Sequence, residues 1–357
     1  MLNFINGRFL SQNTSGVQRF ARQIISALDE YLRTVPDPDE WVLLVPRSAT
    51  PELPLSTIRS ETVGQLAGHF WEQTELLWAS RSGKLVNLCN SGPILHPKSL
   101  TVIHDAMVFR TPENYSKMYR STHRTLQYFL KKRSQIATVS HFSARELSSV
   151  LGLNDVPVLY NGCDHLNREE PEIHILSKHG LHTGSYLLFI GSPSPNKNLS
   201  NAIEAIQMLG DKALTLVIVG SSRGDVFQAL TPVRRIADPA QVVFTGRLSD
   251  AEIVALLQNA RALLFPSLYE GFGIPPLEAM TVGCPVLASD IEPVREVCAD
   301  AAAYFDPKDP TSITRTIKRH IYSPERLDKL SYVGRLRANR FSWSASAEKL
   351  CDLVLKL

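Results

Sequence analysis

Two glutamates in a glycine-rich loop are the residues best placed to do chemistry in this sequence. The run from Phe265 to Met280 contains Glu270 and Glu278, two glycines and two consecutive prolines. An apolar run of strand length precedes it and a helical pattern follows, which predicts a strand, a loop and a helix start. Unpaired N–H groups and the dipole at a helix start favour an anion such as a pyrophosphate. Carboxylates only accept hydrogen bonds, so the two glutamates suit the hydroxyls of a sugar or a ribose.

A second segment of the same kind supplies a cation. Lys197 and Asn198 follow Gly191 and Ser192 at the end of another apolar run. An ammonium group held there would stabilise the negative charge that develops on a departing diphosphate. The alternative interpretation is a solvated surface lysine near a helix start, which is a common feature of proteins.

Three further positions follow predicted strands and are weaker candidates. His104, with Asp105 beside it, ends a strand in the first half, and a histidine can donate or accept near neutral pH. A hydrogen-bonded structural histidine is the competing interpretation. Gly16 follows the first strand and begins a helix. It either lies in a loop that contacts a ligand or is an ordinary glycine at a helix start. Arg247 and Leu248 follow a strand in the second half.

The elements that would position these residues alternate along the chain. Apolar runs of strand length alternate with helical patterns, which predicts crossover units around parallel sheets, and therefore an α/β fold. A polar stretch over 161–184 separates two such halves and reads as a linker. The expected strands are 2–5, 41–45, 85–89, 100–104, 136–139 and 156–160, then 186–190, 214–219, 242–244, 262–265, 286–288 and 302–305. The expected helices are 18–32, 115–132 and 143–151, then 199–209, 226–236, 250–259 and 275–282, with only helices over 311–357.

Size and composition narrow the class of protein. The 357 residues exceed the usual size of one hydrophobic core, which favours two domains. No segment approaches the ~20 apolar residues of a membrane-spanning helix, and the first residues do not resemble a secretory signal, so a cytoplasmic location is expected. The net charge of +3 gives no support for nucleic-acid binding. The cysteines lack zinc-site spacing, and no metal ligands are predicted.

The glutamate loop resembles the signature of the GT4 family, the group 1 retaining glycosyltransferases with the GT-B fold. That signature is two glutamates separated by seven residues, as Glu270 and Glu278 are here. Lys197 and Asn198 resemble the family's Lys-Asn or Lys-Gly pair. Many members carry an arginine near this pair, where this sequence has Ser192 and Asn196. The resemblance covers most of the chain and is closest between about residues 191 and 290.

The resemblance implies roles for individual residues. Glu278 is expected to bind the ribose of a nucleotide-sugar donor, and Glu270 the transferred sugar. Lys197 is expected to stabilise the diphosphate, and His104 to contact the donor sugar near its reacting carbon, so His104, Glu270 and Lys197 are the expected catalytic residues. The remaining residues expected around the donor are Gly16, Gly191, Ser192, Arg247, Leu248, Gly271, Phe272, Gly273 and Ile274.

The resemblance also implies an architecture and a reaction. Two Rossmann-like domains, over 1–165 on the acceptor side and 166–338 on the donor side, would face a cleft, and a helix within 339–357 would pack back on the first. The expected reaction moves a hexose, mannose being the best guess, from a nucleotide diphosphate sugar to a hydroxyl of a saccharide or lipid-linked saccharide, in polysaccharide or O-antigen-type assembly. GDP-mannose is the first guess for the donor, UDP- and dTDP-sugars are alternatives, and no cofactor is expected. A non-catalytic subunit that binds sugar nucleotides is the rival function.

The expected helix over residues 115–133 raises the question of a membrane. Apolar residues stand beside its basic residues, which are Lys117, Arg120, Arg124, Lys131, Lys132 and Arg133. Such a helix can lie on an anionic membrane surface, which would make the protein peripheral at the inner face of the membrane. The favoured interpretation is a crossover helix whose apolar side belongs to the core and whose basic side is solvated.

Overall fold

The computed structural model describes residues 2–36, 38–49, 53–192, 194–220 and 241–357. The described chain divides into two compact units. The N-terminal unit comprises Met1–Gly162 and Ser342–Leu357, and the C-terminal unit comprises Cys163–Phe341. The sequence predicts domain boundaries after residues 165 and 338, whereas the two units divide after residues 162 and 341.

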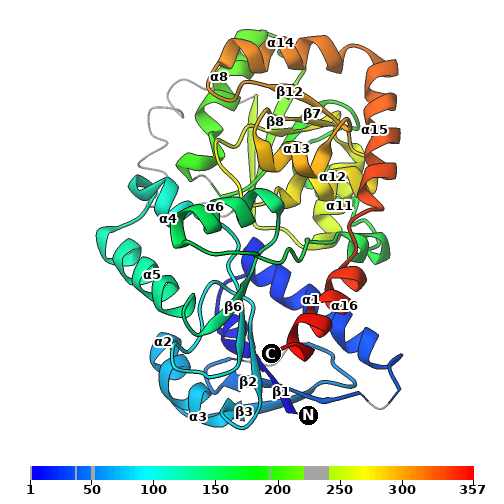
Figure 1. The fold of residues 1–357 in the computed structure, drawn as a ribbon. Helices are drawn as coiled ribbons and strands as arrows, with labels where there is room; N and C mark the ends of the chain where they lie inside the picture. Colours follow the sequence, from blue (N-terminus) through cyan, green and yellow to red (C-terminus); the bar gives the residue numbers. More distant parts are fainter. Residues whose placement is uncertain (1, 37, 50–52, 193, 221–240) are drawn as a thin grey trace. The chain divides into compact units, whose positions relative to one another are not determined.

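The N-terminal unit contains, within its described residues, a six-stranded parallel sheet in the order β3-β2-β1-β4-β5-β6 (Figure 1). The strands are β1 (Leu2–Asn6), β2 (Glu40–Pro46), β3 (Arg59–Val63), β4 (Lys84–Asn87), β5 (Ser99–Val102) and β6 (Ser134–Ala137). The helical elements are η1 (Gly7–Ser11), α1 (Gly16–Leu32), α2 (Gly68–Trp71), η2 (Glu72–Leu76), α3 (Leu77–Ser80), α4 (Met107–Arg110), η3 (Pro112–Asn114), α5 (Lys117–Leu130), α6 (His141–Leu151) and α16 (Trp343–Leu355).

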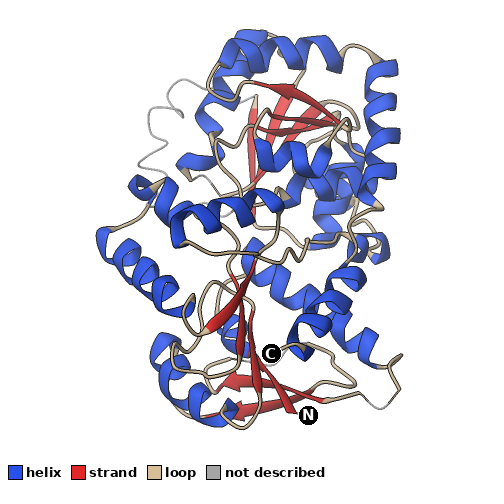
Figure 2. Cartoon of the chain, in the orientation of Figure 1, coloured by secondary structure: helices blue, strands red, loops and turns tan. Residues whose placement is uncertain are grey.

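The described part of the C-terminal unit holds a second six-stranded parallel sheet, in the order β12-β11-β10-β7-β8-β9 (Figure 2). Its strands are β7 (Tyr186–Ile190), β8 (Thr215–Val219), β9 (Val242–Gly246), β10 (Ala262–Phe265), β11 (Val286–Ser289) and β12 (Ala302–Phe305). Its helical elements are η4 (Asp164–Arg168), α7 (His174–Lys178), η5 (Pro195–Lys197), α8 (Leu199–Leu209), α11 (Asp250–Asn259), α12 (Ile274–Val282), α13 (Glu292–Cys298), α14 (Pro310–Ile321) and α15 (Pro324–Ala338).

Continuous apolar strands explain why both sheets lie inside their units. All four residues of β10 and of β11 are buried, as expected for parallel strands that helices cover on both faces. In the C-terminal unit α8 and α14 pack into one core with the strands, through residues such as Ile203 and Ile317. The predicted α/β architecture of two Rossmann-like sheets is confirmed.

Several predicted elements differ from the structure. The segment 156–160 is no strand, because only a bridge between Thr138 and Val158 forms and Pro157 has no N–H to donate to a ladder. The exposed edge strand β3 was missed because its residues are mostly polar and give no apolar run. The short α2, α3 and α13 were also missed. The helix predicted over 226–236 lies outside the described residues.

The last helix belongs to the N-terminal unit. α16 packs against α1, where the rings of Trp343 and Phe20 are 5.7 Å apart. The buried Lys84 of β4 donates from Nζ to the carbonyl oxygens of Val354 and Leu355, at 2.8 and 3.0 Å. These carbonyls lack partners within a helix, so the lysine satisfies the end of α16.

A search of the described helices for one with the length and apolar character needed to cross a membrane found none.

Candidate functional site

The strand order of the C-terminal sheet points to one location for a ligand. From β7 the chain continues to β8 and β9 on one side, and then returns to β10, β11 and β12 on the other. Ligands of such open sheets bind at this reversal, beyond the carboxyl ends of the strands. The loop after β7 contains Lys197 and the loop after β10 contains Glu270. The two segments singled out in the sequence therefore meet at the switch point.

Lys197 and Glu270 form an ion pair at this point. Nζ of Lys197 donates to Oε1 of Glu270 at 2.6 Å, and the two side chains are 19% and 11% exposed. The ammonium also lies 5.6 Å from the ring centre of Phe265, the last residue of β10. Lys197 is therefore held against a carboxylate and an aromatic ring. The alternative interpretation, a solvated surface lysine, is therefore wrong for Lys197.

Asn198 ties the two loops together. It adopts the left-handed conformation, with φ of 57°, which asparagine tolerates better than most residues. Its Nδ2 donates to the carbonyl oxygens of Pro266 at 3.0 Å and Pro307 at 2.7 Å. The amide of Leu268 donates to the carbonyl of Asn196 at 2.7 Å. These bonds fix the loop after β10 against the loop after β7.

The amino end of α12 opens beside this pair. Gly273 precedes the helix with φ of 112°, a value that favours glycine, and no side chain among the described residues caps it. Pro275 and Pro276 follow in the first turn, where their missing N–H groups cost nothing. Glu278 is buried within α12 and Glu270 lies in the loop before it. The arrangement places an uncapped helix start, a cation and two acids around one loop.

Ser267 is a residue that the sequence interpretation passed over. It is buried in the same loop, and its Oγ has no hydrogen-bond partner among the described residues. A buried hydroxyl without a partner costs about 1–3 kcal/mol, so a ligand or a water would be a favourable partner. Serine is common in loops, and only its burial identifies it.

The other predicted donor residues of this unit lie around the same edge or beyond it. Gly191 and Ser192 follow β7, and a Cβ on Gly220 would come within 2.2 Å of the carbonyl oxygen of Gly191, so the two loops touch closely. Gly271, Phe272 and Ile274 belong to the loop and first residue of α12. Arg247, which is exposed, and Leu248 follow β9, and β8 separates that strand from β7.

His104 lies in the N-terminal unit, just after β5. Its Nε2 is 2.9 Å from the carbonyl oxygen of Leu88, and its ring packs edge-on against Phe20 at 4.9 Å. Burial lowers the pKa of His104 to about 4, although the bond to the carbonyl acts in the opposite direction. The side chain is therefore a neutral imidazole at physiological pH. The role predicted for it at the donor sugar stays a prediction.

Gly16 is the exposed first residue of α1. The preceding Ser15 is held by Gln18, whose Oε1 accepts from the Ser15 amide at 3.1 Å. This is a capped helix start, and the structure leaves both interpretations of Gly16 open.

Among the described residues, one group has the composition and spacing of a metal site. Ligand atoms of Glu172, His174 and Glu252 lie within 4.8 Å of one another at the surface of the C-terminal unit. Glu252 also accepts from the amide of Ser249 at 2.8 Å as part of a helix cap. The group shares no residue with the predicted donor site.

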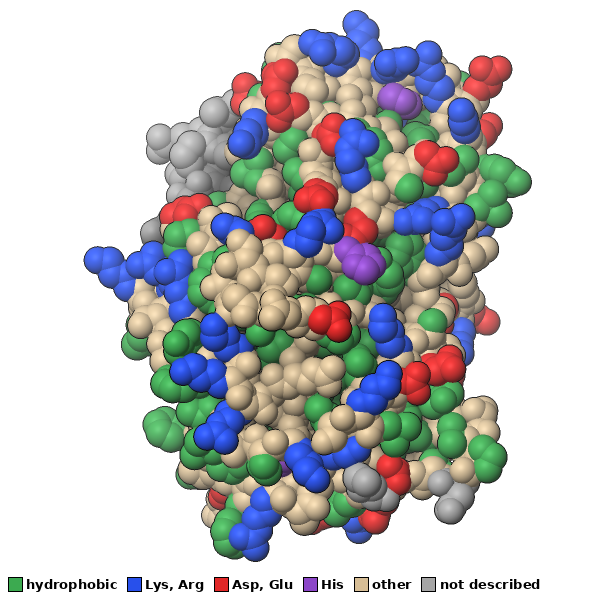
Figure 3. Space-filling view, in the orientation of Figure 1, with side chains coloured by type: hydrophobic (Ala, Val, Ile, Leu, Met, Phe, Trp, Pro, Cys, Tyr) green, Lys and Arg blue, Asp and Glu red, His purple; other side chains and the backbone are tan. Residues whose placement is uncertain are grey.

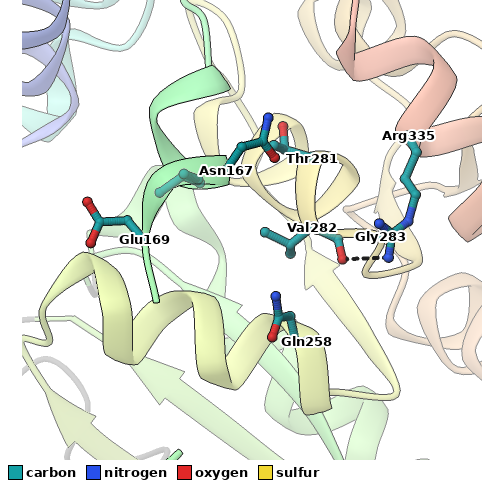
Figure 4. A pocket seen from close by; sticks show the side chains of 8 residues that line it. Asn167, Glu169, Gln258, Thr281, Val282, Gly283 and Arg335 are labelled. Carbon is teal, nitrogen blue, oxygen red and sulfur yellow. Dashed lines mark hydrogen bonds between the residues drawn. The ribbon is translucent and has the colours of Figure 1, made fainter. Parts of the chain in front are cut away.

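A pocket of about 400 Å³ lies elsewhere in the C-terminal unit (Figure 4). It adjoins the carboxyl ends of α11 and α12, where Gln258 and Thr281 line it and Nη2 of Arg335 donates to the Val282 carbonyl at 3.1 Å. Figure 4 shows Asn167 close to Thr281, and the carboxylate of Glu169 turned away. The carboxyl end of α12 lies a helix length, roughly 13 Å, from the glutamate loop. None of the predicted donor residues lines this pocket.

Comparisons with known proteins identify the family of the chain. The family model described as "Glycosyl transferases group 1" matches residues 174–337. The chain is 30% identical over 260 residues to O-antigen chain mannosyltransferase B of Escherichia coli. The aligned region covers 69% of this chain and 67% of that protein. It is also 29% identical over 251 residues to O-antigen chain mannosyltransferase RfbU of Salmonella typhimurium. That aligned region covers 68% of this chain and 66% of that protein.

Solved structures share the fold over the whole chain. WaaG, a glycosyltransferase involved in lipopolysaccharide biosynthesis, has a TM-score of 0.74 at 18% identity and covers 99% of both chains. HepE of Anabaena, in complex with UDP and glucose, has a TM-score of 0.77 at 16% identity and covers 100% of both chains. On the identity to O-antigen chain mannosyltransferase B, the chain belongs to the group 1 glycosyl transferases and is a glycosyltransferase with the GT-B fold.

Proposed function

We propose that this glycosyltransferase transfers a hexose, with retention at the anomeric carbon, from a nucleotide diphosphate sugar to a hydroxyl of a saccharide or lipid-linked saccharide. Mannose is the proposed sugar and O-antigen-type assembly the proposed setting, because two of the similar proteins are O-antigen chain mannosyltransferases. GDP-mannose is the proposed donor, with UDP- and dTDP-sugars as alternatives. The ion pair of Lys197 and Glu270 beside the uncapped start of α12 is the observation that carries the proposal.

The proposed chemistry follows from the charges around the loop. When the bond between the sugar and the diphosphate breaks, negative charge grows on the departing nucleoside diphosphate. The Lys197 ammonium and the amides of Gly273 and Ile274 at the start of α12 stabilise that charge, because the fold already holds these groups beside the loop. Glu270 accepts hydrogen bonds from hydroxyls of the transferred sugar, and Glu278 from the ribose. With these groups at the diphosphate, no bound metal is required.

Kinetics of two alanine variants test these roles. Glu278→Ala is expected mainly to raise the donor KM, because the ribose contact is the same before and during reaction, whereas Glu270→Ala is expected mainly to lower kcat. Glu204→Ala, on the exposed face of α8, is the matched control and should behave as the unaltered enzyme. Unchanged kinetics in both site variants would remove the assignment.

The donor and the rival function are tested together by thermal stability. GDP-, UDP-, dTDP- and ADP-sugars are added in turn, and a ligand at about one hundred times its Kd adds ~2.7 kcal/mol to the free energy of unfolding. GDP-mannose is expected to give the largest shift and to be turned over. Binding without any transfer or donor hydrolysis would favour the non-catalytic subunit. No shift with any sugar nucleotide contradicts donor binding itself.

We further propose peripheral association with an anionic membrane through α5. Its apolar residues are not all core: Met118 is 80% exposed and Phe129 is 45% exposed, next to the exposed Lys117 and Lys132. In Figure 3 several Lys and Arg side chains lie over the region where Figure 1 places α5. Exposed apolar side chains beside basic ones match the surface of a membrane better than a solvated face.

Flotation with vesicles tests this association. The enzyme should float with vesicles that contain phosphatidylserine or phosphatidylglycerol and not with neutral phosphatidylcholine vesicles. Removing three charges together, as Lys117→Gln, Lys132→Gln and Arg133→Gln, should weaken binding by about 3 kcal/mol. A control variant removes two charges from the last turn of α14, as Lys318→Gln and Arg319→Gln, and should float as before. Equal flotation of both variants, or none with anionic lipid, contradicts the proposal.

A further inference from the structure

An aromatic pair holds the loop between β10 and α12, residues 266–273, which we call the donor loop. Phe272 lies between the two glycines of this loop, and its side chain is buried. Its ring meets the ring of Phe341 edge to face, with the centroids 5.8 Å apart and the planes at 82°. Phe341 is also buried and follows the end of α15. Because an edge-to-face pair favours one orientation of its rings, this contact fixes more than burial alone would.

The two parts of the donor loop are fixed in different ways. The first part is held by a polar contact, in which the amide of Leu268 donates to the carbonyl of Asn196 at 2.7 Å. The second part has a glycine on each side of Phe272, and glycine has no side chain to pack. The ring of Phe272 is therefore the side chain through which this second part is held. The amides at the start of α12 follow directly after it.

Phe341 is supported by Arg337, near the end of α15. The guanidinium carbon of Arg337 lies 5.1 Å from the ring centre of Phe341. Its Nε donates to the carbonyl oxygen of Val297 at 2.8 Å, and its Nη2 to that of Glu296 at 2.6 Å. These carbonyls lie in the last turn of α13, where C=O groups lack partners within a helix and a cation is favourable. Arg337 therefore joins Phe341 to the carboxyl end of α13.

The same helix α13 reaches the donor loop. The side chain of the buried Val294 would lie 3.8 Å from a Cβ added to Gly273, which is an ordinary packing distance. Helix α12 packs against both α13 and α15 (Figure 1). Phe341 and α13 thus approach two neighbouring residues of the donor loop, Phe272 and Gly273, and Arg337 contacts both Phe341 and α13.

Phe341 also stands where the chain leaves the C-terminal unit. It is the last residue of that unit, and Ser342 begins the return to the N-terminal unit, in which Trp343 packs on Phe20. To anchor the exit of the chain, burial of any apolar side chain of this size would be sufficient. The oriented contact with Phe272 and the guanidinium bound to α13 exceed that requirement.

We propose that Phe341 is a positioning residue for the donor loop. It holds Phe272 so that the amides of Gly273 and Ile274 stay where the diphosphate of the donor binds. The inference rests on the proposed function, because it takes the start of α12 as the donor site. Preorganised amides stabilise a developing charge only when they are aimed at it, and a misplacement of about 1 Å is sufficient to lower the rate greatly.

Phe341→Leu tests this role, because it removes the ring and keeps an apolar side chain. The matched control is Ile317→Val, a buried change in the core cluster of α8 and α14, which contains neither Phe272 nor Phe341. With GDP-mannose as donor and octyl α-mannoside as acceptor, Phe341→Leu is expected to raise the donor KM about tenfold and to leave the acceptor KM unchanged. Ile317→Val should change neither KM, although both variants unfold at a lower urea concentration. Equal donor KM values in the two variants overturn the proposal.

A double-mutant cycle shows whether Phe341 acts through Phe272. Phe272→Leu alone is expected to raise the donor KM at least as much as Phe341→Leu does. Adding Phe341→Leu to it should cause no further rise, because the contact between the rings is already lost. A full further rise in the double variant would mean that the two residues act independently, which contradicts the proposal.

Arg337→Met tests the support of Phe341 and decides the question if Phe341→Leu does not fold. It keeps an apolar stem and removes the donors to the carbonyls of α13. The expected rise in the donor KM is about threefold, because the ring loses its support but keeps its contact with Phe272. Arg340→Met, at an exposed arginine just beyond α15, is the matched control and should behave as the unaltered enzyme. Equal donor KM values in these two variants contradict the proposed arrangement.

Hydrogen exchange without any ligand separates this proposal from the proposed function. Peptides that cover residues 266–282 should exchange faster in Phe341→Leu than in Ile317→Val, because the donor loop and the start of α12 lose a support. If this holds while no sugar is ever transferred, the proposed function fails and the positioning of the loop stands. If transfer occurs and Phe341→Leu alters neither this exchange nor the donor KM, the positioning fails and the function stands. Faster exchange confined to α16 would make Phe341 an anchor for the exit of the chain alone, which also overturns the proposal.

Discussion

Lys197 and Glu270 form an ion pair in the fold, and the proposed function gives both of them a part in the reaction. Without a ligand each neutralises the other in a partly buried loop. A bound diphosphate sugar would offer the lysine its phosphates and the glutamate its hydroxyls, so both would exchange one partner for another. The proposed roles therefore predict effects of these residues on both stability and rate, and both are measured in the variants.

Lys197→Met keeps the length of the stem and removes the charge. It leaves the carboxylate of Glu270 without this partner, which we expect to cost about 1–3 kcal/mol in the free energy of unfolding. The rate of transfer should fall by more than about tenfold, because the departing diphosphate loses its cation. Lys197→Arg should lose less of both. Denaturation by urea and initial rates measure the two effects, and the exposed Lys212→Met is the control. If Lys197→Met changes neither stability nor rate, the predicted roles of the Lys197–Glu270 ion pair are wrong.

His104 makes the stability of the N-terminal unit depend on pH. Its pKa is about 4 in the fold and has an ordinary value of 6.5, so between these values the unfolded chain binds a proton that the folded chain does not. Stability is therefore lost as pH falls from 6.5 towards 4, by up to about 3 kcal/mol. His104→Gln cannot titrate and should show a shallower decline. Urea denaturation at several pH values measures it, and parallel curves would contradict the prediction.

At the scale of elements, the start of α12 depends on one glycine. Gly273 has φ of 112° and leads the helix into the loop that carries Glu270. A Cβ atom added to Gly273 would lie at least 3.8 Å from any heavy atom outside residues 272–274, so space for a side chain is available. Only the backbone conformation disfavours a substitution there. The amide direction at the helix start is thus set by a conformation that other residues adopt at a cost of about 1–2 kcal/mol.

Gly273→Ala should therefore lower stability and disturb the donor site together. The matched control is Gly210→Ala, which ends α8 with φ of 68° and has no atom within 4 Å of an added Cβ. Both variants should lose about 1–2 kcal/mol. Only Gly273→Ala should raise the donor KM, because only that loop belongs to the proposed donor site. A donor KM that rises equally in the two variants would mean that strain anywhere in the unit is sufficient.

At the scale of the whole molecule, the described chain forms two units with separate cores and separate switch points. The C-terminal unit places Lys197 and Glu270 at its switch point, and the N-terminal unit places Asn6 and the buried Glu72 at its own. Residues 342–357 return to the N-terminal unit, so this unit is assembled from both ends of the chain. Its stability depends on how the last helix is held.

Lys84→Met tests that attachment. Removing the donor of two bonds to the end of α16 should lower the stability of the N-terminal unit by about 1–3 kcal/mol. Hydrogen exchange followed by mass spectrometry should then be faster in α16 and α1 and unchanged in peptides of the C-terminal unit. Lys349→Met, on the exposed side of α16, is the control. Faster exchange throughout both units would contradict a local attachment.

Local patterns in the sequence predict the class of fold and the main candidate loop. Apolar runs of strand length between helical patterns predict parallel sheets, because burial on both faces leaves a local signature. The spacing of Glu270 and Glu278, with glycines and prolines between them, is also local. For the same reason β3 was missed, because an exposed polar edge strand carries no such signature.

Which distant residues meet depends on how the elements pack. Lys197 and Glu270 are 73 positions apart, and Asn6 and Glu72 are 66 apart. Their contacts depend on the order of strands in each sheet, and no local pattern encodes that order. The exposure of Met118 and Phe129 on α5 and the burial of Ser267 likewise follow from packing. Local patterns fix the elements, whereas the long-range contacts that build a site exist only after those elements have packed.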